Sequence, residues 1–589
     1  MSRFLRSFSS VTGRIVGILI LATAALGQAT YTAQVRGVVT DQSGAVVQNA
    51  LITITNEGTG IASTTRSNDQ GLFTFTGLRP AVYTVKCEAQ GFQLSERKGL
   101  VLQVDQQTSV NFTLKPPGVL ATVDVTTAAP PLDTESASLG TDVTNQYVRD
   151  IPLYNRSFFG LTFLAGGVTE TTGTGTDNSN YPSGTNFVSN GQRNATAQVT
   201  LDGSPISAPE QGEGGNSNVY YQPSVEIIQE FKVLNNSFSA EFGNNGGTVV
   251  NIVLKQGTNQ FHGSGWWYGQ RAAFDSRDYF NAGEKPDQLR DQYGFAIGGP
   301  IVKNRTFFFF DIEKVRQQSP VNIVGVVPTD LERQGDFSQS PANLPDPDNP
   351  DTASAGIYDP CAGNTDPNFV CPREQFSDGG VFNKIPAGKI NQIGQNLINL
   401  YPHANIPDAV FPDPNFRKVT LQSDPGWQFD IKLDHQISNN HRIGGRYSRH
   451  HDLLSTPTIV GSGDFNDGII YDTTAQNGSA EYNWSIKPTA LWTSRFSVDR
   501  VFAPGQSNHY PTLADVHLPA ILNQNGLDRV PYINVGDGFL SLYSQCCVDT
   551  KFAHTLISYS SAIQWVRGAH SFKFGGEQRV FYNNFQQPD

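Results

Sequence analysis

Stretches in which apolar and polar residues alternate recur through the second half of this 589-residue chain. Residues 427–434, WQFDIKLD, place Trp, Phe, Ile and Leu on one face of an extended strand and the polar side chains on the other, because strand side chains point alternately to opposite sides. Residues 478–486 and 572–579 repeat the pattern. A soluble sandwich permits any one such strand, but their recurrence with aromatic residues on the apolar face is typical of a membrane-spanning β-barrel.

The N-terminal residues have the composition of a secretory signal peptide. Arg3, Arg6 and Arg14 precede an apolar run at residues 15–26, and small residues follow it. The run is short for a membrane-spanning helix, so we interpret residues 1–28 as a signal peptide, with an N-terminal anchor helix as the alternative. No other stretch approaches 18 consecutive apolar residues. After cleavage, membrane insertion would therefore require a β-barrel.

Charge and motif content exclude several classes of protein. The 41 Lys and Arg against 53 Asp and Glu give a net charge of −12, so no nucleic-acid partner is expected. None of the ten histidines begins an HExxH or His-x-x-Glu zinc motif, and GxxxxGK[ST] and GxSxG are absent. We therefore predict that the chain is not an enzyme and holds no cofactor or metal.

The cysteines fit an exported chain. Cys361 and Cys371 lie in a Pro- and Asp-rich segment at a spacing that permits a small disulfide, which is our candidate pair. Cys87 falls in a strand-like run, where we expect a buried small hydrophobic side chain.

Residues 30–115 predict a small β-sandwich. About seven short alternating runs are separated by turns at residues 41–44, 68–71 and 77–80. The segment carries the motifs Gly37-x-Val39-x-Asp41, Asp69-x-Gly71-x-Phe73, Leu78-x-Pro80-x-x-Tyr83 and Gly91-Phe92. These motifs resemble the carboxypeptidase regulatory-like domain, and the resemblance implies a carbohydrate-binding-like fold.

Residues 116–131 are predicted to be a linker that starts with Pro-Pro-Gly. Within it lies an isolated extended stretch composed of Thr122, Val123, Asp124, Val125 and Thr126. Such a stretch has free backbone groups that a partner's sheet can capture by edge addition. The stretch resembles a TonB box, which implies TonB and its inner-membrane energising complex as partners. An ordinary strand is the alternative.

Residues 132–257 carry several motifs in register. In chain order they are IPLxNR at 151–156, NGQR at 190–193, LDG at 201–203, IQEF at 228–231 and SAEFG at 239–243. Their order and spacing resemble the plug domain of TonB-dependent outer-membrane transporters. The candidate functional residues on these motifs are Arg156, Arg193, Asp202, Glu230 and Glu241. A freestanding α+β domain with solvated charges is the alternative, and structural ion pairing is an alternative role for each charged residue.

Residues 258–589 predict the N-terminal part of a barrel. Tight connections at 302–305, 437–440, 485–488 and 566–569 contrast with the long stretch 317–422, as in outer-membrane barrels with short periplasmic turns and long outer loops. The motifs at 255–263, 293–300 and 306–313 resemble the Oar-like branch of the transporter family. About nine or ten strands are expected, against about 22 in plugged transporters. We therefore expect a fragment of a longer protein that does not insert alone.

The expected fold is mainly β: a small β-sandwich, an α+β plug domain and a partial antiparallel transmembrane β-barrel. The resemblance implies a TonB-dependent receptor and transporter in the outer membrane, with the sandwich in the periplasm. Its partners would be TonB, outer-membrane lipid and an unidentified extracellular ligand such as a saccharide, peptide or chelate. The alternative is a surface binding or adhesion protein that does not transport and uses the sandwich as a carbohydrate-binding module.

Overall fold

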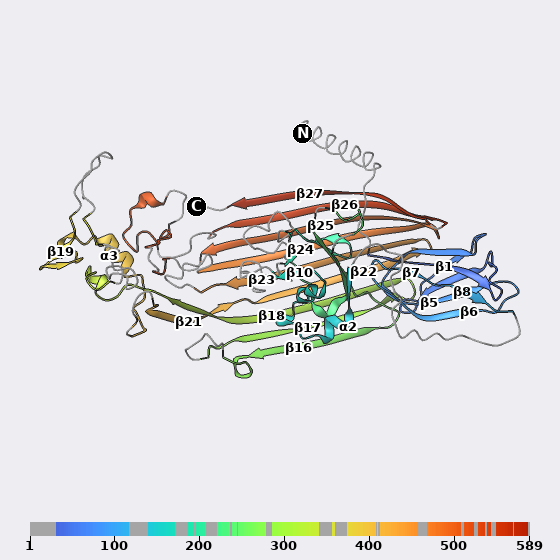
Figure 1. The fold of residues 1–589 in the computed structure, drawn as a ribbon, viewed down its shortest axis with the longest axis horizontal. Coiled ribbons are helices and arrows are strands. Elements are labelled where there is room, and N and C mark those ends of the chain that lie inside the picture. The colour runs from blue at the N-terminus through green and yellow to red at the C-terminus, as the bar shows by residue number, and fades with distance from the viewer. Residues whose placement is uncertain are drawn as a thin grey trace, which may run out of the picture.

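Three β-rich parts follow one another along the chain (Figure 1). They are an N-terminal sandwich, an inner domain and a ten-stranded sheet. The computed structural model describes residues 31–116, 140–170, 187–192, 196–207, 219, 221–235, 238–243, 245–277, 285–340, 356–359, 374–407, 409, 413–457, 468–507, 512–523, 528–535, 539–542, 549–568 and 570–586. The predicted mainly β fold is confirmed.

The N-terminal sandwich has two four-stranded sheets, one ordered β4-β1-β7 with β8 also paired to β1, the other β3-β2-β5-β6. Its strands are β1 (Ala33–Asp41), β2 (Leu51–Asn56), β3 (Ala62–Arg66), β4 (Leu72–Leu78), β5 (Ala81–Glu88), β6 (Ser95–Leu102), β7 (Gln107–Ser109) and β8 (Phe112–Leu114). Alternate side chains of both sheets form one core that includes Ile52, Phe73 and Val85. Cys87 is free and fully buried in this core, as its sequence position predicts.

The turns of the sandwich are set by polar side chains. The carboxylate of Asp41 accepts hydrogen bonds from the backbone N–H groups of Ser43 and Ala45, at 2.8 and 2.9 Å. Gly44 in the same turn has a φ of +86°, which glycine adopts without the steric cost of a side chain. The strand ends that this turn joins are thereby fixed beside each other.

The inner domain is built on a five-stranded sheet ordered β13-β12-β15-β14-β9, with a separate hairpin of β10 and β11. Its elements are β9 (Gly140–Thr144), α2 (Asn145–Asp150), η1 (Tyr154–Arg156), η2 (Phe158–Leu164), β10 (Val168–Glu170), β11 (Phe187–Ser189), β12 (Gln198–Leu201), β13 (Ser204–Pro205), η5 (Val225–Ile227), β14 (Ile228–Asn235) and β15 (Thr248–Leu254). Every residue of β15 is buried, as expected for a central strand covered on both faces.

The large sheet contains ten strands, each antiparallel to its neighbours. They are β16 (His262–Arg271), β17 (Leu289–Val302), β18 (Thr306–Gly325), β21 (Phe416–Ser423), β22 (Gly426–Ser438), β23 (His441–Ser455), β24 (Ile469–Lys487), β25 (Ala490–Ser507), β26 (Lys551–Arg567) and β27 (His570–Gln586). β18 pairs with β22 over its first half and with β21 over its second half. The number of strands agrees with the sequence-based expectation.

The sheet has two different ends. Tight hairpins join β17 to β18, β22 to β23, β24 to β25 and β26 to β27, all at the end that lies beside the sandwich in Figure 1. We call this the short-turn end and the opposite one the long-loop end. The predicted tight turns are therefore confirmed. The predicted long connection is shorter than expected, because residues 317–325 continue β18 and 416–422 belong to β21.

The long-loop end carries the elements η6 (Ala272–Phe274), η7 (Glu332–Gln334), β19 (Ser377–Asp378), β20 (Val381–Phe382), η9 (Ala387–Lys389), α3 (Gln392–Ile398) and η10 (Ala520–Leu522). Segments from two different loops share a small core in which Val327 and Tyr401 pack with Val516 and Leu542. The Arg333 guanidinium donates to three backbone carbonyls of residues 398–402, at 2.6 to 3.0 Å. These contacts join the described parts of the loops into one packed unit.

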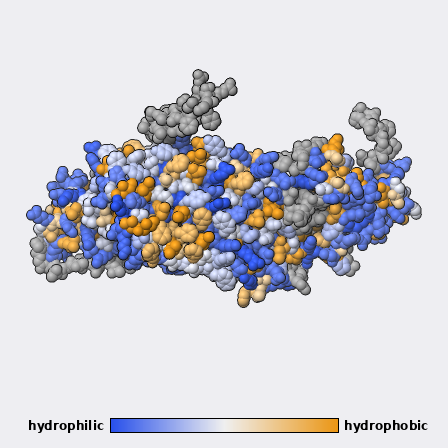
Figure 2. All heavy atoms as spheres, turned by 180° about the vertical axis from the view of Figure 1, so that it is seen from behind, coloured by the Kyte–Doolittle hydropathy of each residue, from blue (hydrophilic) through white to orange (hydrophobic). Residues whose placement is uncertain are grey.

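The two faces of the large sheet differ in the way the alternation predicts. In β22, Gln428, Asp430 and Lys432 are buried, whereas Ile431 and Leu433 are 38% and 46% exposed. The exposed face carries large apolar side chains on every strand from β22 to β27. Seen from behind the view of Figure 1, apolar residues gather between more hydrophilic ends (Figure 2). Among the described residues, no helix is long and apolar enough to cross a membrane.

Charge placed on the exposed face tests whether this face contacts lipid. Ile431 lies near the middle of β22, whereas Val302 ends β17 at the short-turn end. When the chain forms part of a closed barrel in phospholipid vesicles, we expect Ile431→Arg to lower the free energy of unfolding by about 2–4 kcal/mol and Val302→Arg by about 0–1 kcal/mol, because the cost of a charge falls toward the membrane interface. Urea titrations of both variants measure the difference. Equal losses would show that Ile431 does not face the hydrocarbon.

Candidate functional site

The candidate site is the interface at which the inner domain packs on the polar face of the large sheet. The core of the inner domain continues into the sheet, where it takes in Ala296, Phe309, Ala475, Val501 and Phe552. Buried charged groups surround this shared core. The interface therefore combines apolar packing with ion pairs from both parts.

Asp202 pairs with two cationic side chains at this interface. Its Oδ1 lies 3.0 Å from the Lys432 Nζ of β22, and its Oδ2 lies 3.5 Å from the Arg446 Nε of β23. The side chains of all three residues are at most 8% exposed. Oδ1 also accepts from the backbone N–H of Leu254 at 3.2 Å. The carboxylate thus links the inner sheet to two neighbouring strands of the large sheet.

The turn between β12 and β13 brings Asp202 to this position. Asp202 and Gly203 have φ values of +49° and +73°, the signs that a two-residue type I′ hairpin requires. The Arg495 guanidinium of β25 donates to the Gly203 carbonyl at 2.9 Å. A Cβ on Gly203 would lie only 2.5 Å from that guanidinium. The glycine therefore permits both the turn and the close approach of the sheet.

Arg156 makes a second contact between the inner domain and the sheet. Its Nη2 pairs with the Glu226 carboxylate at 2.9 Å, and its guanidinium carbon lies 3.6 Å from the centre of the Tyr268 ring on β16. The Tyr268 hydroxyl donates to Glu226 at 3.1 Å. The three side chains form a closed ion-pair and cation–π group.

Glu241 and Glu230 connect the inner domain to two further parts of the chain. Glu241 forms an ion pair with Lys573 of β27, at the opposite edge of the sheet from β16. Glu230 accepts a short hydrogen bond from the backbone N–H of Val104 in the sandwich. Burial raises the pKa of the Glu230 carboxyl to about 8, and the nearby Asp142 charge adds to this rise, while the Val104 N–H and Lys232 act in the opposite direction.

The sandwich also contacts the large sheet at the short-turn end. The Tyr31 hydroxyl donates to Glu481 Oε1 at 2.8 Å, and the Arg79 Nη1 lies 2.5 Å from Asp434 Oδ1. In the segment that leads from β15 to β16, the Asn259 Nδ2 donates to the carbonyl of Thr59 in the sandwich at 2.6 Å. The sandwich is therefore attached both to the sheet and, through Glu230, to the inner domain.

Several interface residues were not found from the sequence. Tyr221 donates to Asp430, and Ser224 and Trp266 donate to Glu313 at 3.2 and 2.9 Å. Alternation had already placed Asp430 and Lys432 on the polar face of β22, but it contains no information on the inner-domain residues opposite them. The polar-face positions of Asp430, Lys432 and Glu481 were predicted without their partners, and the missed residues are Tyr221, Ser224, Trp266, Glu313, Arg446 and Arg495.

Other predicted features lie outside the described residues. These are the signal peptide at 1–28, the candidate TonB box Thr122–Thr126, the candidate plug residue Arg193, and the candidate disulfide partners Cys361 and Cys371. Within the part of the chain that the structure describes, no group of three or more His, Cys, Asp or Glu residues is arranged to hold a metal ion. The described interface is chemically a set of ion pairs and hydrogen bonds that join three parts of one chain.

Two family models match the chain. Residues 253–589, more than half of the chain, match the outer membrane beta barrel domain, and residues 34–115 match the carboxypeptidase regulatory-like domain. The chain is 26% identical over 314 residues to the TonB-dependent transporter Oar of Myxococcus xanthus, an alignment that covers 50% of this chain and 28% of that protein. The match thus spans less than a third of the length of that relative.

The solved structures that partly match this chain include a transporter and a receptor. The outer membrane transporter YddB of Escherichia coli gives a TM-score of 0.44 at 9% identity, with 76% of this chain and 53% of that chain covered. The siderophore receptor PirA of Acinetobacter baumannii gives a TM-score of 0.42 at 10% identity, and the match covers 76% of this chain and 48% of that chain.

Removal of the Asp202 carboxylate tests the contribution of its ion pairs. Asp202→Ala leaves Lys432 and Arg446 buried without this partner, so we expect the inner domain to be destabilised by about 3–5 kcal/mol. Asp150→Ala is the matched control, because it removes an exposed pair with Arg149 that contributes about 1 kcal/mol or less. Hydrogen exchange at the backbone amides of β12 and β15 measures the loss of stability of the inner domain in each of the two variants. Equal effects would show that the Asp202 pairs do not hold the interface.

The raised pKa of Glu230 predicts a pH dependence. In the folded chain the Glu230 carboxyl stays protonated up to about pH 8. An unperturbed glutamate, with a pKa of 4.5, loses its proton at a much lower pH. The stability from this group is therefore complete below pH 4.5 and is lost as the pH rises through 8. Glu230→Gln keeps an acceptor for Val104 but does not titrate. We expect denaturant titrations to show a steeper loss of stability between pH 5 and 8 in the unmodified chain than in this variant, and identical slopes would contradict the assignment.

Proposed function

Because the chain belongs to the family of outer membrane beta barrel domains, we propose that it acts as a TonB-dependent receptor and transporter in that membrane. The inner domain serves as the plug, and the large sheet is barrel wall. The protein carries its ligand without reacting with it. The similarity to the Myxococcus xanthus transporter supports this proposal over half of the chain.

The observation that carries the proposal is the way in which the inner domain fills the polar face of the sheet. Asp202, Arg156 and Glu241 each make an ion pair or cation–π contact with the sheet, on β22 and β23, β16 and β27 respectively. A domain anchored from one edge of a barrel wall to the other obstructs the lumen. The inner domain therefore has to move or rearrange before a ligand can pass through the barrel.

The two ends of the sheet suggest an orientation. Outer-membrane barrels have short periplasmic turns and long extracellular loops. The short-turn end and the sandwich attached to it would then face the periplasm, and the packed loops around Arg333 and Tyr401 would face outward. An external ligand, for example a saccharide, peptide or chelate, would bind these loops and the outer side of the inner domain.

The buried ion pairs give a reason for energised transport. Breaking one buried pair by moving one partner away costs about 3–5 kcal/mol. Several such contacts hold the inner domain in place, so thermal motion alone opens the lumen rarely. TonB would pair with residues 122–126, which lie between the sandwich and the inner domain in the chain, and would transmit the force that separates the pairs.

A non-transporting surface binding or adhesion protein is the second candidate function. It is supported by the match of residues 34–115 to the carboxypeptidase regulatory-like domain, which in such a protein would serve as the binding module. The two functions differ in their need for energy, because an adhesion protein binds its ligand without TonB.

Backbone substitution in residues 122–126 tests TonB recruitment. The double variant Val123→Pro with Asp124→Pro removes neighbouring N–H donors, which point to opposite edges of an extended strand. We expect the purified chain in detergent to bind the purified periplasmic domain of TonB from the same organism, and the variant to bind at least tenfold more weakly.

The matched control is the double variant Ala128→Pro with Ala129→Pro, which adds two prolines to the same linker outside the box. It should bind TonB within twofold of the unmodified chain. An unmodified chain that does not bind TonB would contradict the transporter and favour the adhesion protein. Equal loss in both double variants would contradict the assignment of the box while leaving TonB dependence in place.

A further inference from the structure

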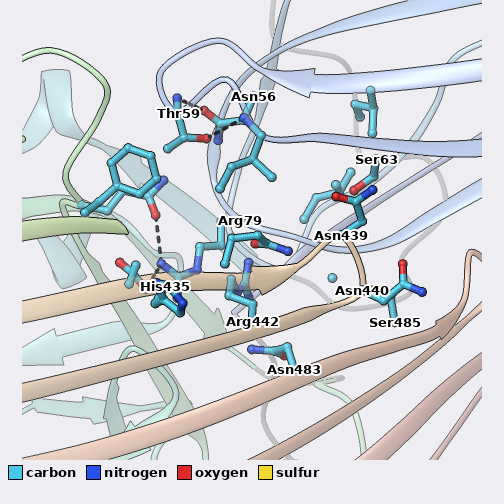
Figure 3. A pocket seen from close by; sticks show the side chains of 18 of the residues that line it. Asn56, Thr59, Ser63, Arg79, His435, Asn439, Asn440, Arg442, Asn483 and Ser485 are labelled. Carbon is cyan, nitrogen blue, oxygen red and sulfur yellow. Dashed lines mark hydrogen bonds and ion pairs between the residues drawn. The ribbon is translucent and has the colours of Figure 1, made fainter. Parts of the chain in front are cut away.

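A polar hollow lies at the short-turn end between the sandwich and the hairpins of the large sheet. Its cavity volume is about 100 Å³, which is room for a small ligand of a few heavy atoms rather than for a drug-sized molecule. Its lining includes Asn56 and Arg79 of the sandwich, and Asn439, Asn440, Arg442 and Asn483 of the sheet. Figure 3 shows these side chains converging from the two parts of the chain. We call this space the interdomain hollow.

Two guanidinium groups in the interdomain hollow have unused hydrogen-bond donors. The Arg79 side chain is only 9% exposed, and its Nη1 contacts Asp434 at 2.5 Å and Gln256 at 3.0 Å. Its Nε has no hydrogen-bond partner among the described residues. The Nε and Nη2 atoms of Arg442 likewise have no hydrogen-bond partner within the described part of the chain. A buried charged group whose hydrogen bonds are not made raises the free energy of the folded state. These donors therefore favour a ligand that carries hydrogen-bond acceptors.

The negative charges nearby are already engaged by other groups. Arg442 Nη2 lies 3.7 Å from Glu481, beyond hydrogen-bond distance. That carboxylate accepts two bonds from Arg495 and one from the Tyr31 hydroxyl. Asp434 is paired with Arg79. The hollow therefore presents cationic donors whose charge is only partly compensated.

The remaining lining is polar and neutral. Asn439 and Asn440 form the turn between β22 and β23. Asn483 of β24 also lines the hollow, but its amide already donates to Glu481 and accepts from Thr493. Amide side chains donate and accept hydrogen bonds at once, so they match hydroxyl, amide or ether groups of a small molecule. A purely inorganic anion would leave this part of the lining without a matching group.

We propose that the interdomain hollow binds a small organic molecule through a carboxylate. The carboxylate accepts from the unpaired N–H groups of Arg79 and Arg442, and the rest of the molecule contacts the asparagines. Guanidinium groups pair strongly with carboxylates because both are planar and the hydrogen bonds are charge-assisted. The Asp434 carboxylate beside Arg79 disfavours a dianion such as phosphate more than a monoanionic carboxylate.

The site is formed jointly by the sandwich and the large sheet. Arg79 lies at the end of β4, and Arg442 is the second residue of β23. A ligand that contacts both residues stabilises the docked arrangement over any arrangement in which the sandwich has moved away. This site is separate from the long-loop end, where the transported ligand is proposed to bind, so neither proposal depends on the other.

Binding of succinate to the full chain in detergent tests the proposal. Isothermal titration should show one succinate per chain, and succinamide, which has the same shape without the charge, should bind at least tenfold more weakly. Arg442→Gln should weaken succinate binding at least tenfold. Arg567→Gln, which removes an exposed arginine from the hairpin between β26 and β27 at the same end, should change it less than twofold.

Further measurements separate the remaining outcomes. Arg442→Lys keeps the charge but loses the planar pair of donors, so we expect a loss of succinate affinity smaller than that of Arg442→Gln. The lysine variant replaces Arg442→Gln in the test if the glutamine variant does not fold. Phosphate binding more tightly than succinate would overturn the carboxylate assignment. No succinate binding, equal binding of succinamide, or equal losses in Arg442→Gln and Arg567→Gln would overturn the site itself.

Discussion

The buried pairing of Asp202 with Lys432 and Arg446 is the contact on which the arrangement of the inner domain depends. A strand in a barrel wall has one face toward lipid and one toward the lumen, and its inward charges need either water or a partner. Here the inner domain supplies the partner. The same contact explains why the polar face of β22 is the buried one and its apolar face the exposed one, the reverse of a soluble protein.

The sequence predicts the faces of the sheet better than the lengths of its strands. Alternation in β22 depends only on local residues, and both faces are as expected. β18 was expected to end before residue 317, yet it continues to Gly325 through Pro320. Proline lacks the N–H that a central strand uses and normally argues against one. Pro320 is accommodated because β17 pairs with β18 only as far as Gln318, so beyond that residue β18 has a strand partner, β21, on one side only. The pairing with β21, which starts near residue 416, is long-range and leaves no local signal.

The charged residues singled out by sequence motifs could be located, but their partners could not. Asp202, Arg156, Glu230 and Glu241 all lie at contacts between parts of the chain. Lys573, the partner of Glu241, is 332 positions away in the sequence. Val104 contributes only a backbone N–H to Glu230, which no side-chain pattern reveals. The motifs therefore identify these residues, whereas their burial and their pairing require the fold.

The sandwich connects the two other parts at the short-turn end. It holds the inner domain through Val104 and Glu230, and the sheet through Tyr31 with Glu481 and Arg79 with Asp434. Displacement of the inner domain toward this end requires the sandwich either to move with it, which breaks its contacts with the sheet, or to stay, which breaks its contact with Glu230. The hydrogen bonds and ion pairs of the sandwich therefore add to those that hold the inner domain in the sheet. Because residues 117–139 connect the sandwich to the inner domain, a force applied to that segment acts on both attachments at once.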